Sequence, residues 1–110
     1  MAWHAVHRYA RISPRKARLV ADLIRGRDVQ DALNVLKFTP NRAAGMLSKV
    51  LTSAIASANE AEADVDLLVV AEARVDEGPT IPRWHPKDRG RAHPIKKRTS
   101  HLMVAVDQEQ

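Results

Sequence analysis

Residues 82–101 (PRWHPKDRGRAHPIKKRTSH), where the sequence is most informative about chemistry, are rich in Lys and Arg, with Trp84, His85 and His93 interleaved. Guanidinium and ammonium groups pair with phosphates, and Trp or His rings stack on unpaired bases, as in proteins that hold folded RNA. A basic loop is often only a solvated surface, and Trp84 could instead anchor the segment on the body. Prolines, a Trp and a central Gly together favour nucleic-acid contact. The candidate residues are Arg83, Trp84, His85, Lys87, Arg89, Arg91, Lys96, Lys97 and Arg98.

Catalytic and metal-binding chemistry has much weaker support. The chain has no cysteine, which excludes disulfides and thiolate chemistry. Its five histidines lack the helical pairing with an acid that is typical of metal sites. Neighbouring acids, such as Asp76 and Glu77, fall where element ends are expected, and no Gly-rich phosphate loop or nucleophile elbow is present. We therefore expect no enzyme, no metal and no cofactor.

The charge is divided into blocks along the chain. Residues 1–51 carry 10 Lys or Arg against 3 acids, residues 52–77 carry 1 against 7, and residues 78–106 carry 7 against 1. The net charge is +5 and the isoelectric point is near 10.1. Two basic blocks around an acidic one indicate a polyanionic partner more than an evenly solvated surface.

Length and composition favour one small domain, residues 1–110, with a thin core. Alanine supplies 17 residues, so helices and sheet must approach closely. The longest apolar stretch, Leu67 to Ala71, is far below the roughly 20 residues that span a bilayer. The first residues have no apolar signal core, so we expect a cytoplasmic protein without membrane contact.

Three helices are predicted to position the basic residues. The first begins at Ser13-Pro14, where the Ser hydroxyl could cap the helix, and ends at Gly26. Its apolar stripe is Ala17, Val20, Ala21 and Ile24, while Arg15, Lys16 and Arg18 lie near the N-terminal end, against the helix dipole. A phosphate partner explains that unfavourable placement. A second helix opens at residues 28–31 and ends near residue 38. Thr39-Pro40 repeats the pattern of a capping residue and a proline, so a third helix is predicted from there to about residue 63, with residues 43, 44, 47, 50, 51, 54, 55 and 58 on one apolar face.

Extended segments are predicted at residues 3–12, 67–75 and 102–106. Simple alternation in the second places Leu68 and Val70 on the face of Glu72 and Arg74. The proline-bearing basic segment reads as an antiparallel ribbon that turns near residues 87–90, with arms reaching ~30 Å or more.

Four motifs resemble the family of the bacterial large-subunit ribosomal protein numbered twenty-two, and the resemblance covers residues 5–106. They are ISPRKARLVADLIRG (12–26), KVLTSAIA (49–56), VDEGP (75–79) and GRA…KRTSH (90–101). The resemblance implies an α+β body of three helices on a small three-stranded antiparallel sheet, with a long hairpin over about residues 77–98. It also implies a constituent of the large subunit that binds its ribosomal RNA, aids assembly and lines the nascent-peptide exit tunnel with the hairpin.

Carried over by position, the resemblance places RNA contacts on three parts of the chain. Residues 83–91 would form the hairpin tip and residues 97–101, including Thr99 and His101, its returning base. The body's RNA surface would contain Arg8, Arg11, Arg15, Lys16 and Arg18. Expected partners are ribosomal RNA, neighbouring ribosomal proteins and the nascent peptide, without homo-oligomerisation. The chain departs from the family pattern at Asp88 in the tip and at Pro82 and Pro94, which should limit pairing between the arms.

Two other function classes remain as alternatives. An architectural DNA-binding protein could insert a basic, proline-bearing ribbon into a groove, but it would need a large apolar dimer interface that this alanine-rich inventory does not favour. A hydrolase would need a nucleophile, for which the sequence offers no candidate. From the residues alone, without the resemblance, the prediction is a basic α+β nucleic-acid binder.

Overall fold

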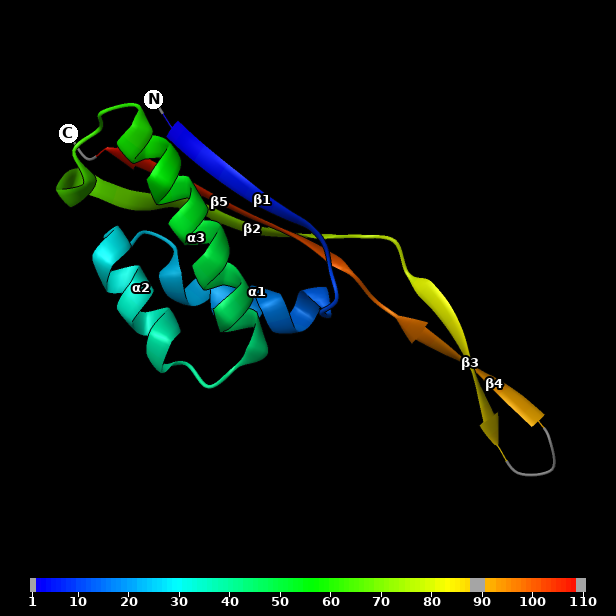
Figure 1. Ribbon diagram of the computed structural model, residues 1–110. Helices are drawn as coiled ribbons and strands as arrows, with labels where there is room; N and C mark the ends of the chain where they lie inside the picture. The colour runs from blue at the N-terminus through cyan, green and yellow to red at the C-terminus, as the bar shows by residue number, and fades with distance from the viewer. Residues whose placement is uncertain (1, 88–90, 109–110) are drawn as a thin grey trace.

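The computed structural model describes the backbone of residues 2–87 and 91–108 and the side chains of residues 2–80 and 98–108. A three-stranded antiparallel sheet has the strand order β1-β5-β2, and the three α-helices lie on one of its faces (Figure 1). A second, two-stranded sheet, β3-β4, projects away from this body. The elements are β1 (Ala2–Ala10), α1 (Pro14–Ile24), α2 (Val29–Phe38), α3 (Arg42–Glu60), η1 (Val65–Leu67), β2 (Leu68–Glu77), β3 (Ile81–Lys87), β4 (Arg91–Lys97) and β5 (Ser100–Gln108).

The predicted fold class is confirmed, and the apolar stripes identify the core correctly. Helix α1 buries Pro14 and the four predicted stripe residues. Helix α3 packs on β1 and β5, α1 packs on β2, and α2 packs against α1 and α3. Alanines 17, 21, 32, 43, 54 and 58 have no exposed surface, so small side chains bring the helices close to one another and to the sheet.

The start of α3 differs from the prediction. The side chain of Asn41, not Thr39, caps the helix by accepting a hydrogen bond from the Ala43 N–H at 3.0 Å. The Thr39 hydroxyl instead donates to the Val35 carbonyl at 2.6 Å and so helps to close α2. At α1 the Ser13 backbone has the extended N-cap conformation, but its hydroxyl makes no capping bond. Pro40 therefore separates two helix ends and does not begin a helix.

A β-bulge in β2 overturns the predicted alternation. The register against β5 shifts between Val70 and Glu72, so Leu68 and Val70 are buried before the bulge and Ala73 and Val75 after it. The extra residue changes which side chains point inward. Apolar residues thus face the helices on both sides of the shift, whereas a regular strand would have buried Glu72 and Arg74.

Helix α1 and the turn after it cover the exposed edge of β2. Arg18 donates two hydrogen bonds to the Val75 carbonyl, at 3.2 and 3.1 Å, and Arg25 donates to the Ala73 carbonyl at 2.7 Å. Gly26, with φ +82°, donates its N–H to the Val70 carbonyl at 2.9 Å. These bonds satisfy edge groups that would otherwise remain open for pairing.

The ladder between β3 and β4 passes through the prolines without a register shift, from Ile81↔Lys97 to Lys87↔Arg91. The expectation that Pro82 and Pro94 limit pairing was therefore wrong. Both prolines fall in pairs of the same phase, Pro82↔Lys96 and Trp84↔Pro94. Residue pairs in an antiparallel ladder alternate between those that exchange hydrogen bonds and those that do not. In the second kind the backbone N–H points away from the partner strand, so a proline there removes no bond of the ladder. Because both proline pairs are of the same kind, neither proline need interrupt the ladder. The turn is predicted near residues 87–90; Lys87 is the last residue of β3, and residues 88–90 lie outside the described residues.

Within residues 2–87 and 91–108, no helix combines the length and the apolar character needed to cross a membrane.

Because the buried alanines are closely packed, replacing an alanine with a larger residue should lower the free energy of unfolding at buried positions and not at exposed ones. Ala54→Leu adds three carbons at a site with no exposed surface, and we expect a loss of about 1–3 kcal/mol in the free energy of unfolding. Ala56→Leu makes the same change on the exposed side of α3 and should stay within about 0.5 kcal/mol of the parent. Urea unfolding of both variants is the measurement. Equal losses at the two positions would contradict the packing argument.

Candidate nucleic-acid interface

Four of the predicted RNA-binding residues lie together in one open groove. Arg11, Arg15, Lys16 and Arg98 line it, joined by Arg42. The groove has a volume of about 710 Å³ and lies where the loop after β1 meets the first turns of α1 and α3. Residues 11–16, 41–42 and 98 are distant in sequence, and the fold brings their cations to one surface.

The groove is electropositive for two independent reasons. Its lining contains no Asp or Glu, and its five cations have no ion-pair partner within the described part of the chain. The groove also contains the N-terminal ends of α1 and α3, and neither helix has an acid in its first turn. Helix N-termini carry partial positive charge and unpaired N–H groups. The arrangement opposes folding of the isolated chain but suits an anion.

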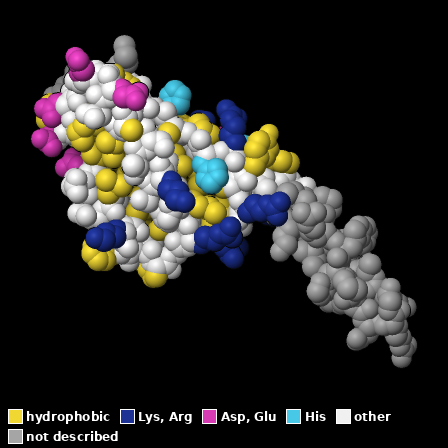
Figure 2. All heavy atoms as spheres, viewed as in Figure 1, with side chains coloured by type: hydrophobic (Ala, Val, Ile, Leu, Met, Phe, Trp, Pro, Cys, Tyr) yellow, Lys and Arg dark blue, Asp and Glu magenta, His cyan; other side chains and the backbone are white. Residues whose placement is uncertain are grey.

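Most acids of the body are paired with other cations or lie at the end away from the groove, and Glu77 at the root of the hairpin is an exception. Asp22 pairs with Arg25 at 2.6 Å and Asp31 with Arg27 at 2.9 Å, while Arg74 bridges two acids of β2. On the face drawn in Figure 2, acidic side chains gather at the end of the body away from the hairpin, and Lys and Arg lie over its middle and toward the hairpin. On this face, acidic residues therefore lie at one end of the body and basic residues lie over the rest of it, toward the hairpin.

Three of the four other predicted contact residues in the body have structural partners. Arg18 holds the edge of β2, as described above. The Thr99 side chain is buried and donates its hydroxyl to the Pro79 carbonyl at 2.6 Å. The ring nitrogen Nδ1 of His101 accepts a hydrogen bond from the Tyr9 N–H at 3.1 Å. Arg8 is exposed and, among the described residues, has no ion pair. RNA contact by these four residues stays a prediction.

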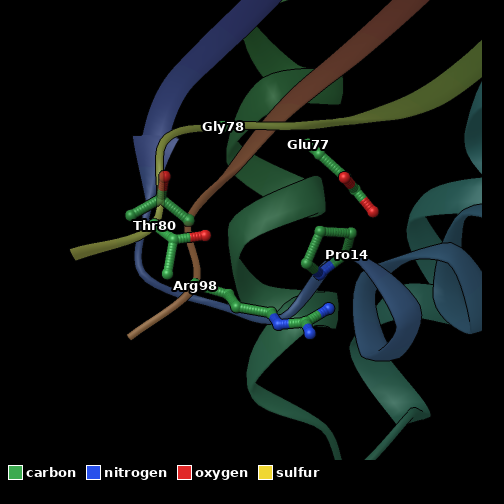
Figure 3. Close-up of a pocket in the computed structure, with 6 residues that line it drawn as sticks. Pro14, Glu77, Gly78, Thr80 and Arg98 are labelled. Carbon is green, nitrogen blue, oxygen red and sulfur yellow. The ribbon is translucent and has the colours of Figure 1, made fainter. Parts of the chain in front are cut away.

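The hairpin leaves the body through a tight contact between two strands. The last β2–β5 pair is Glu77↔Ser100, and beyond it the Gly78 N–H donates to the Thr99 carbonyl at 2.9 Å. A small hollow of about 160 Å³ lies here, lined by Pro14, Glu77, Gly78, Thr80, Arg98 and Thr99 (Figure 3). In this view Arg98 extends toward Pro14 at the start of α1. The root of the hairpin is therefore joined to the groove through Arg98.

The remaining predicted residues are placed by backbone alone. The β3-β4 ladder contains Arg83, Trp84, His85, Lys87, Arg91, Lys96 and Lys97, whose side chains lie outside the described part of the chain; all of Arg89 lies outside it.

Sequence reasoning missed Asn41 and Arg42. The signal was available, because Arg42 repeats at α3 the pattern of a cation in a helix's first turn that singled out Arg15 and Lys16 at α1. Among the described side chains, no group of three His, Asp or Glu could hold a metal ion.

Comparison with known proteins gives a consistent result over nearly the whole chain. The family model described as ribosomal protein L22p/L17e matches residues 5–107. The large ribosomal subunit protein uL22 of Maridesulfovibrio salexigens is 55% identical over 107 residues, covering 96% of this chain and 97% of the relative. That of Rubrobacter xylanophilus is 59% identical over 103 residues, covering 93% and 81% respectively. That of Thermoanaerobacter pseudethanolicus is 51% identical over 111 residues and covers 100% of both chains.

Alanine substitution should change the free energy of unfolding in opposite directions at two glycines, Gly78 at the root of the hairpin and Gly45 on α3. A Cβ at Gly78 would lie 2.5 Å from Thr99 Oγ1 and 3.3 Å from the Thr99 carbonyl atoms. Rotating Thr99 away would break its bond to Pro79, so Gly78→Ala should destabilise the protein by roughly 1–3 kcal/mol. Gly45→Ala, on the exposed side of α3 with no atom within 4 Å of the new Cβ, should stabilise it by about 0.5–1 kcal/mol.

Thermal unfolding of the two variants and of the double variant Gly78→Ala/Thr99→Ala tests this contact. Removing Oγ1 should make the double variant less destabilised than the sum of its single changes, because the clash and the Pro79 bond involve the same atom. Strict additivity would show that the contact does not constrain Gly78.

Proposed function

Because the chain belongs to the ribosomal protein L22p/L17e family, we propose that it binds large-subunit ribosomal RNA through the groove between the first turns of α1 and α3. The family is structural, and the chain is not an enzyme; it is a bacterial ribosomal protein of the cytoplasm. Its function is that of a structural constituent of the large ribosomal subunit.

The observation that carries the proposed RNA contact is the groove of five cations without ion-pair partners in the described part of the chain. Three of these cations, Arg15, Lys16 and Arg42, occupy the first turns of α1 and α3, where their own charge is least favourable for folding. Phosphate groups reverse the sign of that interaction, since they are attracted by the side chains and by the helix ends together. RNA thus compensates an electrostatic conflict built into the body, and this gives the chain a part in subunit assembly.

The hairpin extends the proposal beyond the body. Residues 78–106 carry 7 Lys or Arg, and β3-β4 projects from the body as a continuous ladder. A ribbon of this kind can pass between RNA segments that a compact body cannot reach. We propose that it lines the nascent-peptide exit tunnel, with the nascent peptide and neighbouring ribosomal proteins as further partners. Family membership is the ground for preferring RNA to the DNA-binding alternative.

Ultraviolet crosslinking in cells, followed by sequencing of the attached nucleic acid, tests the proposal directly. A few discrete sites in the large ribosomal RNA, some of them at the tunnel, are expected. Scattered DNA, or RNA without preferred sites, would contradict it. The crosslinked ribosomal segment then provides the RNA fragment for quantitative binding.

Neutralising the groove is expected to weaken binding and flatten its salt dependence. The variant Arg11→Gln/Arg15→Gln/Arg42→Gln removes three groove cations, so the slope of log K against log[salt] should fall by roughly two to three. Fluorescence anisotropy with the RNA fragment, over about 50–200 mM salt, measures the slope.

A matched variant controls for net charge. Arg27→Gln/Lys37→Gln/Lys49→Gln removes the same charge from exposed residues outside the groove and should change the slope much less. The groove variant should also keep or slightly gain stability, because cations leave helix N-termini. Equal slopes for the two variants would exclude the groove as the binding site.

A further inference from the structure

Tyr9 has a backbone conformation that side chains rarely adopt. Its φ is +57°, within the irregular part of the β1–β5 ladder between His7 and Ala10. A non-glycine residue in this left-handed region is strained and persists only where its surroundings impose it. Such strain calls for an explanation from what the residue contacts or presents.

His101 holds Tyr9 in this conformation. The Tyr9 N–H, freed from the ladder by the irregularity, donates to Nδ1 of His101 at 3.1 Å. The two rings meet edge to face, with centroids 4.9 Å apart and an interplanar angle of 86°. Because Nδ1 accepts this bond, the neutral imidazole carries its proton on Nε2. Backbone and ring of Tyr9 are thus both fixed by one side chain of the central strand.

The fold does not use the Tyr9 ring for its core. The side chain is 63% exposed and is absent from the buried cluster and from the apolar residues packed against it. Arg8 precedes Tyr9 in the sequence and Arg11 follows it by two residues; both are exposed, and neither has an ion pair in the described part of the chain. Arg11 also lines the cationic groove, so Tyr9 is two residues from the proposed phosphate-binding surface along the chain.

We propose that Tyr9 is a stacking platform for one unpaired base of the RNA, and that His101 is its positioning residue. This inference rests on the proposed RNA-binding function and adds a base contact to the phosphate contacts of the groove. An aromatic ring presented rigidly loses little conformational entropy when a base stacks on it. Arg11, two residues further along the chain, belongs to the groove that would take neighbouring phosphates.

Stacking and phosphate pairing differ in their dependence on salt, which separates this inference from the groove proposal. Tyr9→Leu should weaken binding of the crosslinked ribosomal RNA fragment by roughly 5- to 150-fold, the range measured for loss of one stacked base, with the salt slope unchanged. Tyr9→Phe keeps the ring and should bind within about twofold of the parent. Phe38→Leu makes the same kind of change at a 78% exposed ring on α2 and should have no effect.

A second substitution guards against loss of folding. Asn tolerates the left-handed conformation better than other non-glycine residues, so Tyr9→Asn should leave the protein at least as stable while still losing the stacked base. Weak binding by a variant that unfolds no earlier than the parent supports a direct contact.

The positioning role of His101 has its own readout. With 5-iodouridine in the RNA fragment, photo-crosslinking and mass spectrometry should identify Tyr9 as an attachment site. His101→Ala should lower the crosslink yield at Tyr9 several-fold without changing the salt slope. His101→Asn supplies a side-chain oxygen that can accept the Tyr9 N–H and should restore much of the yield.

Three results would overturn the inference. Parent-like binding by Tyr9→Leu would remove the stacking contact and leave the groove proposal standing. Parent-like RNA binding combined with weaker binding of a neighbouring ribosomal protein would assign Tyr9 to a protein contact. Failure of the parent protein itself to bind the fragment would instead reject the proposed function, together with this inference.

Discussion

The pairing of β5 with both of its neighbours is the constraint on which the rest of the structure depends. β5 hydrogen-bonds to β1 along one side and to β2 along the other, and its buried residues Leu102, Val104 and Val106 face the helices. Neither β1 nor β2 has another strand partner in the described part of the chain. The sheet, the surface for the helices and the base of the hairpin all require this strand.

The same strand connects the two parts of the proposed interface. Immediately before it, Arg98 lines the groove and Thr99 holds Gly78 and Pro79 at the root of the hairpin. Inside it, Ser100 donates its hydroxyl to the Ile12 carbonyl at 2.6 Å, which holds the loop that leads into α1. Groove and hairpin are therefore fixed to one short segment.

The sequence predicted the elements well where one periodicity decided them. The stripe of α1 and the long face of α3 needed only regular spacing, and both proved correct. The predictions that proved wrong concern positions where two local arrangements were both possible. Asn41 and Thr39 could each cap a helix, and the bulge near Ala71 reversed the faces of β2 because burial outweighed regularity. The cluster of Arg11, Arg42 and Arg98 depends on tertiary packing, which local spacing does not encode.

The central position of β5 also affects when the body can form. β1 and β2 precede β5 in the chain, with all three helices between β1 and β2, so most sheet contacts join residues far apart in sequence. Folds dominated by such contacts form slowly, because loops must close before pairing compensates the lost entropy. During synthesis from the N-terminus, β1 and β2 emerge before the strand that pairs with them. Every Lys and Arg of the chain is therefore synthesised before β5, the strand that completes the sheet.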